Sequence, residues 1–132
     1  MTDDFPPTAE RMVAIARDTF DALPEPLRTA AARVNTRVEE FAAPEILSDL
    51  EIADPFTLTG LYVGVPLIDD SVTFPSAEAP MIFLYRQPIL AEWSARSDVD
   101  IEHLVAHVFI HELGHHFGWS DEEMDALVNR ED

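Results

Sequence analysis

The sequence predicts a single α+β domain that spans residues 1–132. A chain of this length is one domain's worth of sequence. Hydrophobic residues make up 47% of it, which is enough to build a core without disulfide or metal staples. Strand-like segments lie in the middle of the chain and the longest helical segment follows them, an order that is typical of the α+β class.

The N-terminal segment predicts a helix over residues 8–23. Thr8 is a suitable N-cap, and apolar side chains recur behind it at helical spacing. These apolar positions are Met12, Ile15, Ala16, Phe20 and Leu23. Pro24 and Pro26 end this helix, and residues 27–32 can add a short second one.

The middle of the chain predicts three strands. Residues 34–39 alternate between apolar or β-branched and polar side chains, which favours a half-buried strand. After Pro44, residues 45–50 can form one or two helical turns. Residues 60–65 and 81–85 are rich in strand formers, and the second run is continuous enough for a central strand. The prolines and paired aspartates between them predict a loop over residues 66–80.

The C-terminal part predicts three helices. Residues 88–95 favour a short one, and the longest begins at residue 97 or 98 and ends at Phe117, before Gly118. Three acidic side chains in its expected first turn complement the helix dipole. They are Asp98, Asp100 and Glu102. A short closing helix is expected over residues 122–129.

The charge balance excludes several classes of function. Acidic residues number 26 against 8 basic ones, all of them arginine, for a formal net charge of −18. Such a field repels phosphate backbones and anionic membranes, so we expect no binding to nucleic acid or to membranes. The absence of cysteine and lysine excludes thiolate and Schiff-base chemistry. The acidic, proline-containing start has no secretory pattern, so a cytoplasmic location is expected.

Four of the five histidines recur at intervals of four residues. They are His103, His107, His111 and His115. Since four residues advance a helix by about 400°, these side chains share nearly one face. Residues 111–115 read His-Glu-Leu-Gly-His, an HExxH motif. Two imidazoles one turn apart can share a zinc ion, and Glu112 can accept a proton from water held by it.

A third metal ligand is expected at Asp121. Gly118 can adopt the positive-φ turn that lets the chain leave the helix and return toward the metal three residues later. The string from His111 to Asp121 therefore reads HExxHxxGxxD. Three protein ligands with a fourth position for water are typical of catalytic rather than structural zinc sites.

Asp121 also has a structural interpretation. Ser120 and Glu123 form a capping-box pattern at the start of the expected last helix, and Asp121 lies within it. Capping and ligation can coexist. The alternative third ligands are Glu122 and His116.

Structural or supporting roles are expected for the other histidines and for the two tyrosines. His103 and His107 are expected to be solvated or to support the ligands, and His116 to lie at the surface or behind the ligands. Tyr62 and Tyr85 are expected to pack, although a tyrosine hydroxyl could also donate to an oxyanion.

The string over residues 111–121 resembles the zincin metallopeptidases, in particular the Asp-zincin pattern. The whole chain resembles the small bacterial zincin-like metallopeptidase family. The shared segments are Gly60-Leu61-Tyr62, Leu84-Tyr85-Arg86 and residues 111–118. The resemblance implies a minimal zincin-like fold, in which a small sheet packs on the motif helix beside a substrate cleft. It also implies that His111, His115 and Asp121 bind zinc and that Glu112 is the general base.

These observations favour a monomeric zinc-dependent peptidase acting on a peptide or protein substrate. An extended peptide would lie along an exposed strand edge beside the motif helix. One alternative is a zinc-binding module without turnover, and another is a zinc hydrolase of non-peptide substrates. The intact Glu112 favours an enzyme, because ligation by the two histidines does not require it.

Overall fold

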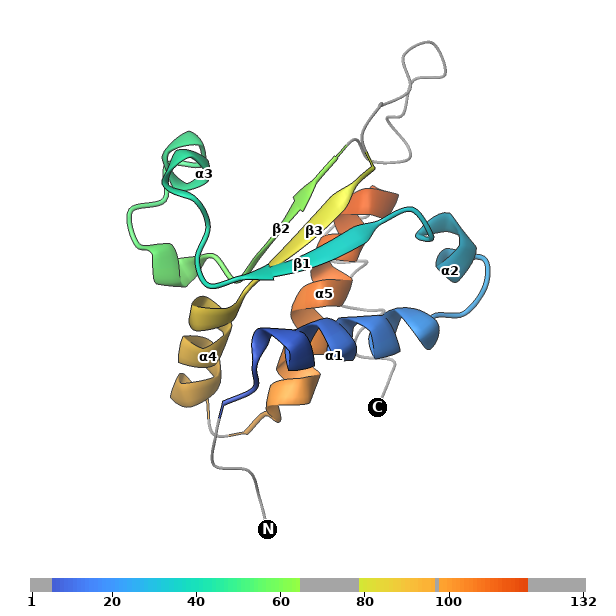
Figure 1. The fold of residues 1–132 in the computed structure, drawn as a ribbon, viewed down its shortest axis with the longest axis horizontal. Coiled ribbons are helices and arrows are strands. Elements are labelled where there is room, and N and C mark those ends of the chain that lie inside the picture. Colours follow the sequence, from blue (N-terminus) through green and yellow to red (C-terminus); the bar gives the residue numbers. More distant parts are fainter. Residues whose placement is uncertain (1–5, 65–78, 97, 119–132) are drawn as a thin grey trace.

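The computed structural model describes residues 6–64, 79–96 and 98–118 (Figure 1). Within these ranges the fold is a mixed α+β arrangement of a three-stranded sheet and several helices, as the sequence predicts. The longest helix lies in the C-terminal half and packs against the sheet.

The sheet has the strand order β1-β3-β2. Strand β1 (Asn35–Glu39) pairs in parallel with β3 (Met81–Tyr85), with Asn35 opposite Met81. Strand β2 (Gly60–Val63) is antiparallel to β3, with Gly60 opposite Leu84. Among the described residues β2 pairs with β3 alone, so its outer side is an edge of the sheet.

Two helices cover one face of the sheet. Helix α1 (Ala9–Asp21) contacts β1, and α5 (Ile101–Phe117) crosses behind β2 and β3 while also contacting α1 (Figure 1). Ile82 and Leu84 point from β3 into the core between these layers. The helices supply most of the other buried core side chains, including Met12, Ile15, Leu104, Val105, Val108, Phe109 and Leu113.

Short elements connect these layers. Helices α2 (Leu27–Ala30) and α3 (Pro44–Asp49) flank β1 in the sequence. A 3₁₀ turn, η1 (Pro55–Thr57), precedes β2, and helix α4 (Arg86–Ala95) follows β3 directly. None of the helices in the described ranges combines the length and apolar composition that crossing a membrane requires.

Several sequence predictions are confirmed. Thr8 caps α1, because its hydroxyl accepts a hydrogen bond from the Arg11 backbone N–H at 3.1 Å. The predicted central strand has the bounds of β3. Strand β1 begins one residue later than expected, but Thr36 and Val38 keep the predicted half-buried phase. Gly118 ends α5 in the left-handed conformation with φ 79°.

The predicted start of the longest helix is wrong. Asp100 has an extended backbone and is the N-cap of α5, so Asp98 lies before the helix and only Glu102 lies in its first turn. Acidic side chains favour a helix start at Asp98. However, Val99 packs against the core, and the first turn of α5 begins after it. Helix α4 begins two residues earlier than predicted, because a proline in the first turn needs no intrahelical N–H.

Two further predictions differ or lie beyond what is described. The second strand ends at Val63 rather than at residue 65. The loop expected over residues 66–80 and the closing helix expected over residues 122–129 lie largely or wholly outside the described residues.

Candidate metal centre

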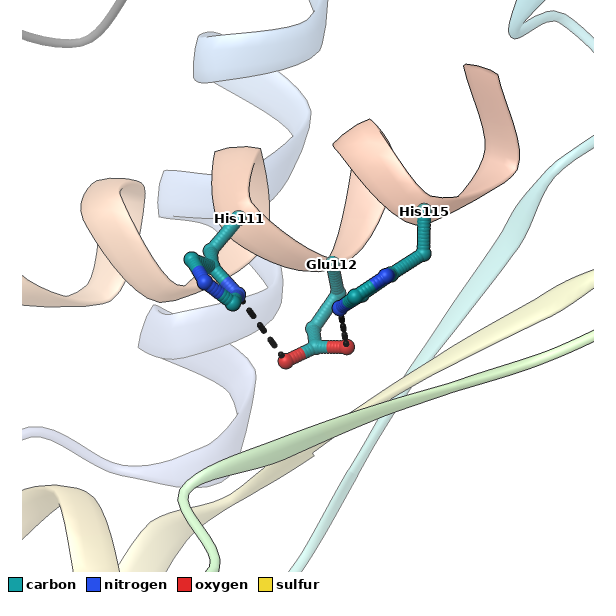
Figure 2. A group of neighbouring side chains, drawn as sticks. All are labelled: His111, Glu112 and His115. Atoms are coloured by element: carbon teal, nitrogen blue, oxygen red, sulfur yellow. Dashed lines mark ion pairs between the residues drawn. The ribbon is translucent and has the colours of Figure 1, made fainter. Parts of the chain in front are cut away.

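The C-terminal half of α5 brings together two imidazoles and one carboxylate. One ligand atom each from His111, Glu112 and His115 lie within 4.8 Å of one another (Figure 2). In the part of the chain that the structure describes, this is the one group of three such side chains close enough to share a metal ion. The predicted helical spacing therefore produces the predicted cluster.

The Glu112 carboxylate lies between the two rings. Its Oε2 is 3.6 Å from His111 Nδ1 and its Oε1 is 3.9 Å from His115 Nε2 (Figure 2). Both distances exceed a normal hydrogen bond, so these contacts are electrostatic. The two imidazoles meet edge to face, with centroids 5.4 Å apart.

Glu112 is the buried member of the cluster. Its side chain is 12% exposed, against 34% for His111 and 44% for His115. Burial raises the pKa of the Glu112 carboxyl above its ordinary value. The positive charges that His115 and His111 can carry, and a hydrogen bond from the Tyr62 backbone N–H, lower this pKa without cancelling the effect of burial.

A glycine allows β2 to approach this helix closely. A Cβ placed on Gly60 would lie 2.8 Å from Val108 Cγ1 and 3.1 Å from Glu112 Cγ. A larger residue would push strand and helix apart. The absence of a side chain at position 60 therefore sets the sheet edge directly beside Glu112.

The donor set fits a divalent metal ion. Two nitrogens bound to one zinc ion lie at most about 4.2 Å apart, which is twice the Zn–N distance. Atoms that already lie within 4.8 Å of one another need only a small side-chain movement to reach this spacing. Imidazole nitrogen and carboxylate oxygen are both ordinary zinc donors.

The two earlier histidines of the stripe lie elsewhere. His103 and His107 line a groove of about 800 Å³ between α1 and α5, together with Arg11. The described lining of this groove does not include His111 or His115. His103 and His107 are therefore not among the three clustered side chains of the described residues, and their expected solvated or supporting role stays a prediction.

His116 and Tyr62 contact each other. His116 is only 4% exposed, so of the two positions expected for it, at the surface or behind the ligands, the structure excludes the surface. Its Nδ1 lies 2.8 Å from the Tyr62 hydroxyl, which therefore does more than pack. Position 116 follows the buried positions 105, 109, 112 and 113 at helical spacing, a signal that could have predicted its burial. No comparable signal marks the contact of the Tyr62 backbone with Glu112.

Tyr85 is a packing residue, as expected. Its ring is 1% exposed and stacks on Phe83. Its hydroxyl is buried and has no hydrogen-bond partner among the described residues. Burial, with smaller contributions from the charges of Glu39 and Glu112, raises the pKa of Tyr85 to about 12.

The third ligand stays a prediction. Asp121 and its alternative Glu122 lie outside the described residues. His116, the other alternative, directs its ring nitrogens to Tyr62 and, at 3.4 Å, to the Ala30 carbonyl oxygen. Because of these contacts, His116 is a weaker candidate for the third metal ligand than Asp121 or Glu122.

An HExxH helix packed beside the edge strand of a small sheet defines a zincin-like class of protein. The sequence model of the family described as zincin-like metallopeptidase matches residues 31–130, and the chain belongs to this family. A solved structure of a conserved hypothetical protein from Thermus thermophilus has a similar fold, with a TM-score of 0.53 and 21% sequence identity. The similarity covers 93% of this chain and 99% of that one. None of the curated proteins compared matches the chain.

Proposed function

We propose that the protein is a zinc-dependent peptidase with Glu112 as its general base. The observation that carries this proposal is the convergence of His111, Glu112 and His115 within 4.8 Å at the end of a helix packed on a sheet edge. Membership of the zincin-like metallopeptidase family supports the same reaction class.

His111, His115 and Asp121 are the residues that would hold the zinc ion. When bound, zinc would supply a Lewis acid that polarises a water molecule and the scissile carbonyl. The exposed edges of His111 and His115 leave the ligand nitrogens accessible from solvent, whereas Glu112 lies behind them against the sheet.

Glu112 would move the proton. Its raised pKa makes the carboxylate a better proton acceptor near neutral pH, because proton transfer is most efficient when the base is matched to the working pH. Glu112 would accept a proton from the attacking water and then donate it to the leaving amine. The Tyr62 backbone N–H would keep the carboxylate oriented through both steps.

The substrate would bind along β2. This strand is an edge of the sheet and lies beside the metal cluster, so an extended peptide can add to it by hydrogen bonds to backbone groups other than the Tyr62 N–H, which Glu112 occupies. A peptide held there places a carbonyl near Glu112. This arrangement supports a peptide over a nucleic acid as substrate, as does the net charge of −18.

Native mass spectrometry with added zinc, together with cleavage of a peptide library, tests the proposal. We expect one zinc ion per chain and cleavage by the wild type. Glu112→Gln should keep the metal and lose about 10²- to 10⁴-fold in rate, because the amide cannot accept a proton. The matched control is Glu102→Gln, the same change at an exposed position of α5 that pairs with Arg11.

Two results would reject the proposal. Zinc binding without cleavage of any peptide by the wild type would favour the alternative of a zinc-binding module. Equal cleavage by wild type and Glu112→Gln would remove Glu112 from the reaction.

A further inference from the structure

His116 is a buried residue directly after a proposed metal ligand. Adjacent helical residues differ by about 100° in direction, so His116 points into the protein while His115 is exposed. His116 Nδ1 lies 2.8 Å from the Tyr62 hydroxyl, and Nε2 makes a longer contact of 3.4 Å with the Ala30 carbonyl oxygen. Because a carbonyl only accepts, the Nε2 contact favours the tautomer with its proton on Nε2, in which Nδ1 accepts a hydrogen bond from the Tyr62 hydroxyl.

Tyr62 contacts α5 with both its main chain and its side chain. The backbone N–H donates to the Glu112 carboxylate, and the hydroxyl is hydrogen-bonded to His116 one helical turn further on. The side chain also lies against Gly64, where an added Cβ would come within 2.7 Å of the Tyr62 hydroxyl oxygen. The absence of a side chain at Gly64, directly after β2, therefore leaves the space that the Tyr62 ring needs to reach His116.

We propose that Tyr62 and His116 are positioning residues whose hydrogen bond fixes β2 against α5 and thereby holds the Tyr62 amide on Glu112. Close packing at Gly60 holds one end of the strand against the helix, and the Tyr62–His116 bond holds the part that carries the amide. Loss of the bond lets this part of β2 move away from α5. The role in catalysis rests on the proposed function, whereas the structural link does not.

Tyr62→Phe tests the proposal with Tyr85→Phe as its matched control. Both variants remove one hydroxyl from a tyrosine of the sheet, and the Tyr85 hydroxyl has no partner among the described residues. In Tyr62→Phe we expect kcat to fall about 10- to 100-fold with KM and zinc affinity little changed, since outer residues of metal sites have effects of this size. Tyr85→Phe should retain the wild-type kcat.

Amide hydrogen exchange supplies a readout that does not depend on activity. The amide of residue 62 should exchange at least about tenfold faster in Tyr62→Phe than in the wild type, with or without added zinc. His116→Gln keeps an acceptor and a donor, so it should preserve slow exchange, whereas His116→Leu should not. A role limited to packing predicts that leucine is tolerated at least as well as glutamine.

His116→Leu gives a second route if Tyr62→Phe does not fold. It removes the partner of the Tyr62 hydroxyl and leaves the tyrosine intact, so the same loss of kcat and faster exchange are expected. Unchanged exchange at residue 62 together with wild-type kcat in the folded variants would overturn the proposal. If the wild type cleaves no peptide, the proposed function fails, and the exchange rates alone still decide whether the pair holds the amide.

Discussion

The proposed chemistry of the metal centre depends on two carboxylates, Glu112 and Asp121, which are expected to have different roles. Glu112 is buried between two imidazoles and held by the Tyr62 backbone, so its environment favours a proton acceptor. Asp121 lies outside the described residues, and its proposed role depends on the spacing after Gly118. Each role can be tested by a single substitution.

Asp121→Ala should weaken zinc binding steeply if Asp121 is a ligand, because only two protein ligands remain. If Asp121 only caps a helix, the same change should cost about 0.5–2 kcal/mol of stability and leave zinc affinity nearly unchanged. Asp121→His should partly restore binding in the first case only, since histidine binds zinc but caps poorly. Thermal unfolding during a zinc titration of both variants distinguishes these outcomes.

Glu112→Gln should stabilise the zinc-stripped protein at neutral pH. Because burial raises the pKa of Glu112, the folded state binds this proton more tightly than the unfolded chain does. The resulting stabilisation is complete below the ordinary carboxyl range and is lost as pH rises through the folded-state pKa. Glutamine carries no titrating proton, so the Glu112→Gln variant does not lose stability in this way as pH rises.

Thermal unfolding in chelator between pH 4 and pH 8 measures this effect. The Gln variant should melt higher than the wild type at pH 7 and at a similar temperature near pH 4. Glu102→Gln, the same change at an exposed position of α5, is the control. A more stable wild type at pH 7 would mean that Glu112 is not destabilised by its burial.

At the scale of elements, the site depends on how closely β2 lies against α5. Helix α5 supplies the ligands and the general base, but the strand supplies the amide that orients Glu112. Gly60 allows this approach because a Cβ there would overlap Val108. The helix and the strand therefore form the site together.

Gly60→Ala should destabilise the fold by about 1–3 kcal/mol, the usual cost of overpacking, and should lower kcat as β2 is displaced from Glu112. Val63→Ala is the control on the same strand, since Val63 is 47% exposed. Denaturant unfolding and peptide cleavage are measured on both variants. Wild-type stability and kcat in Gly60→Ala would show that the strand can shift without consequence.

For the whole molecule, the acidic excess dominates the electrostatic field. Several arginines are already paired with glutamates, which leaves the surplus of carboxylates uncompensated. These pairs are Arg11–Glu102, Arg28–Glu25, Arg37–Glu39, Arg86–Glu40 and Arg96–Glu92. With a net charge of −18, the protein should attract cationic peptides and repel anionic ones.

Raising the salt concentration from 50 to about 500 mM should therefore lower kcat/KM for a lysine-rich peptide and raise it for a glutamate-rich one. Electrostatic steering of this kind changes rates by about tenfold or more. A neutral peptide with the same residues around the cleaved bond is the control. Identical salt dependence for all three peptides would show that the field does not act at the site.

The features that the sequence alone determined are local ones. The cluster of His111, Glu112 and His115 follows from spacing on one helix, because residues three and four apart on a helix are neighbours whatever packs around it. The Thr8 cap and the bounds of β3 likewise depend on a few adjacent residues. Membership of the zincin-like family was also recognisable from such short segments.

Only the tertiary structure decided the contacts between distant segments. The parallel pairing of β1 with β3, the burial of His116 against Tyr62 and the contact of the Tyr62 amide with Glu112 join residues about 45 to 55 positions apart. No periodicity or motif encodes these contacts, since each depends on how whole elements pack around a shared core. The sequence therefore determined which side chains could hold a metal, and the packing of β2 on α5 decided how the general base among them is oriented.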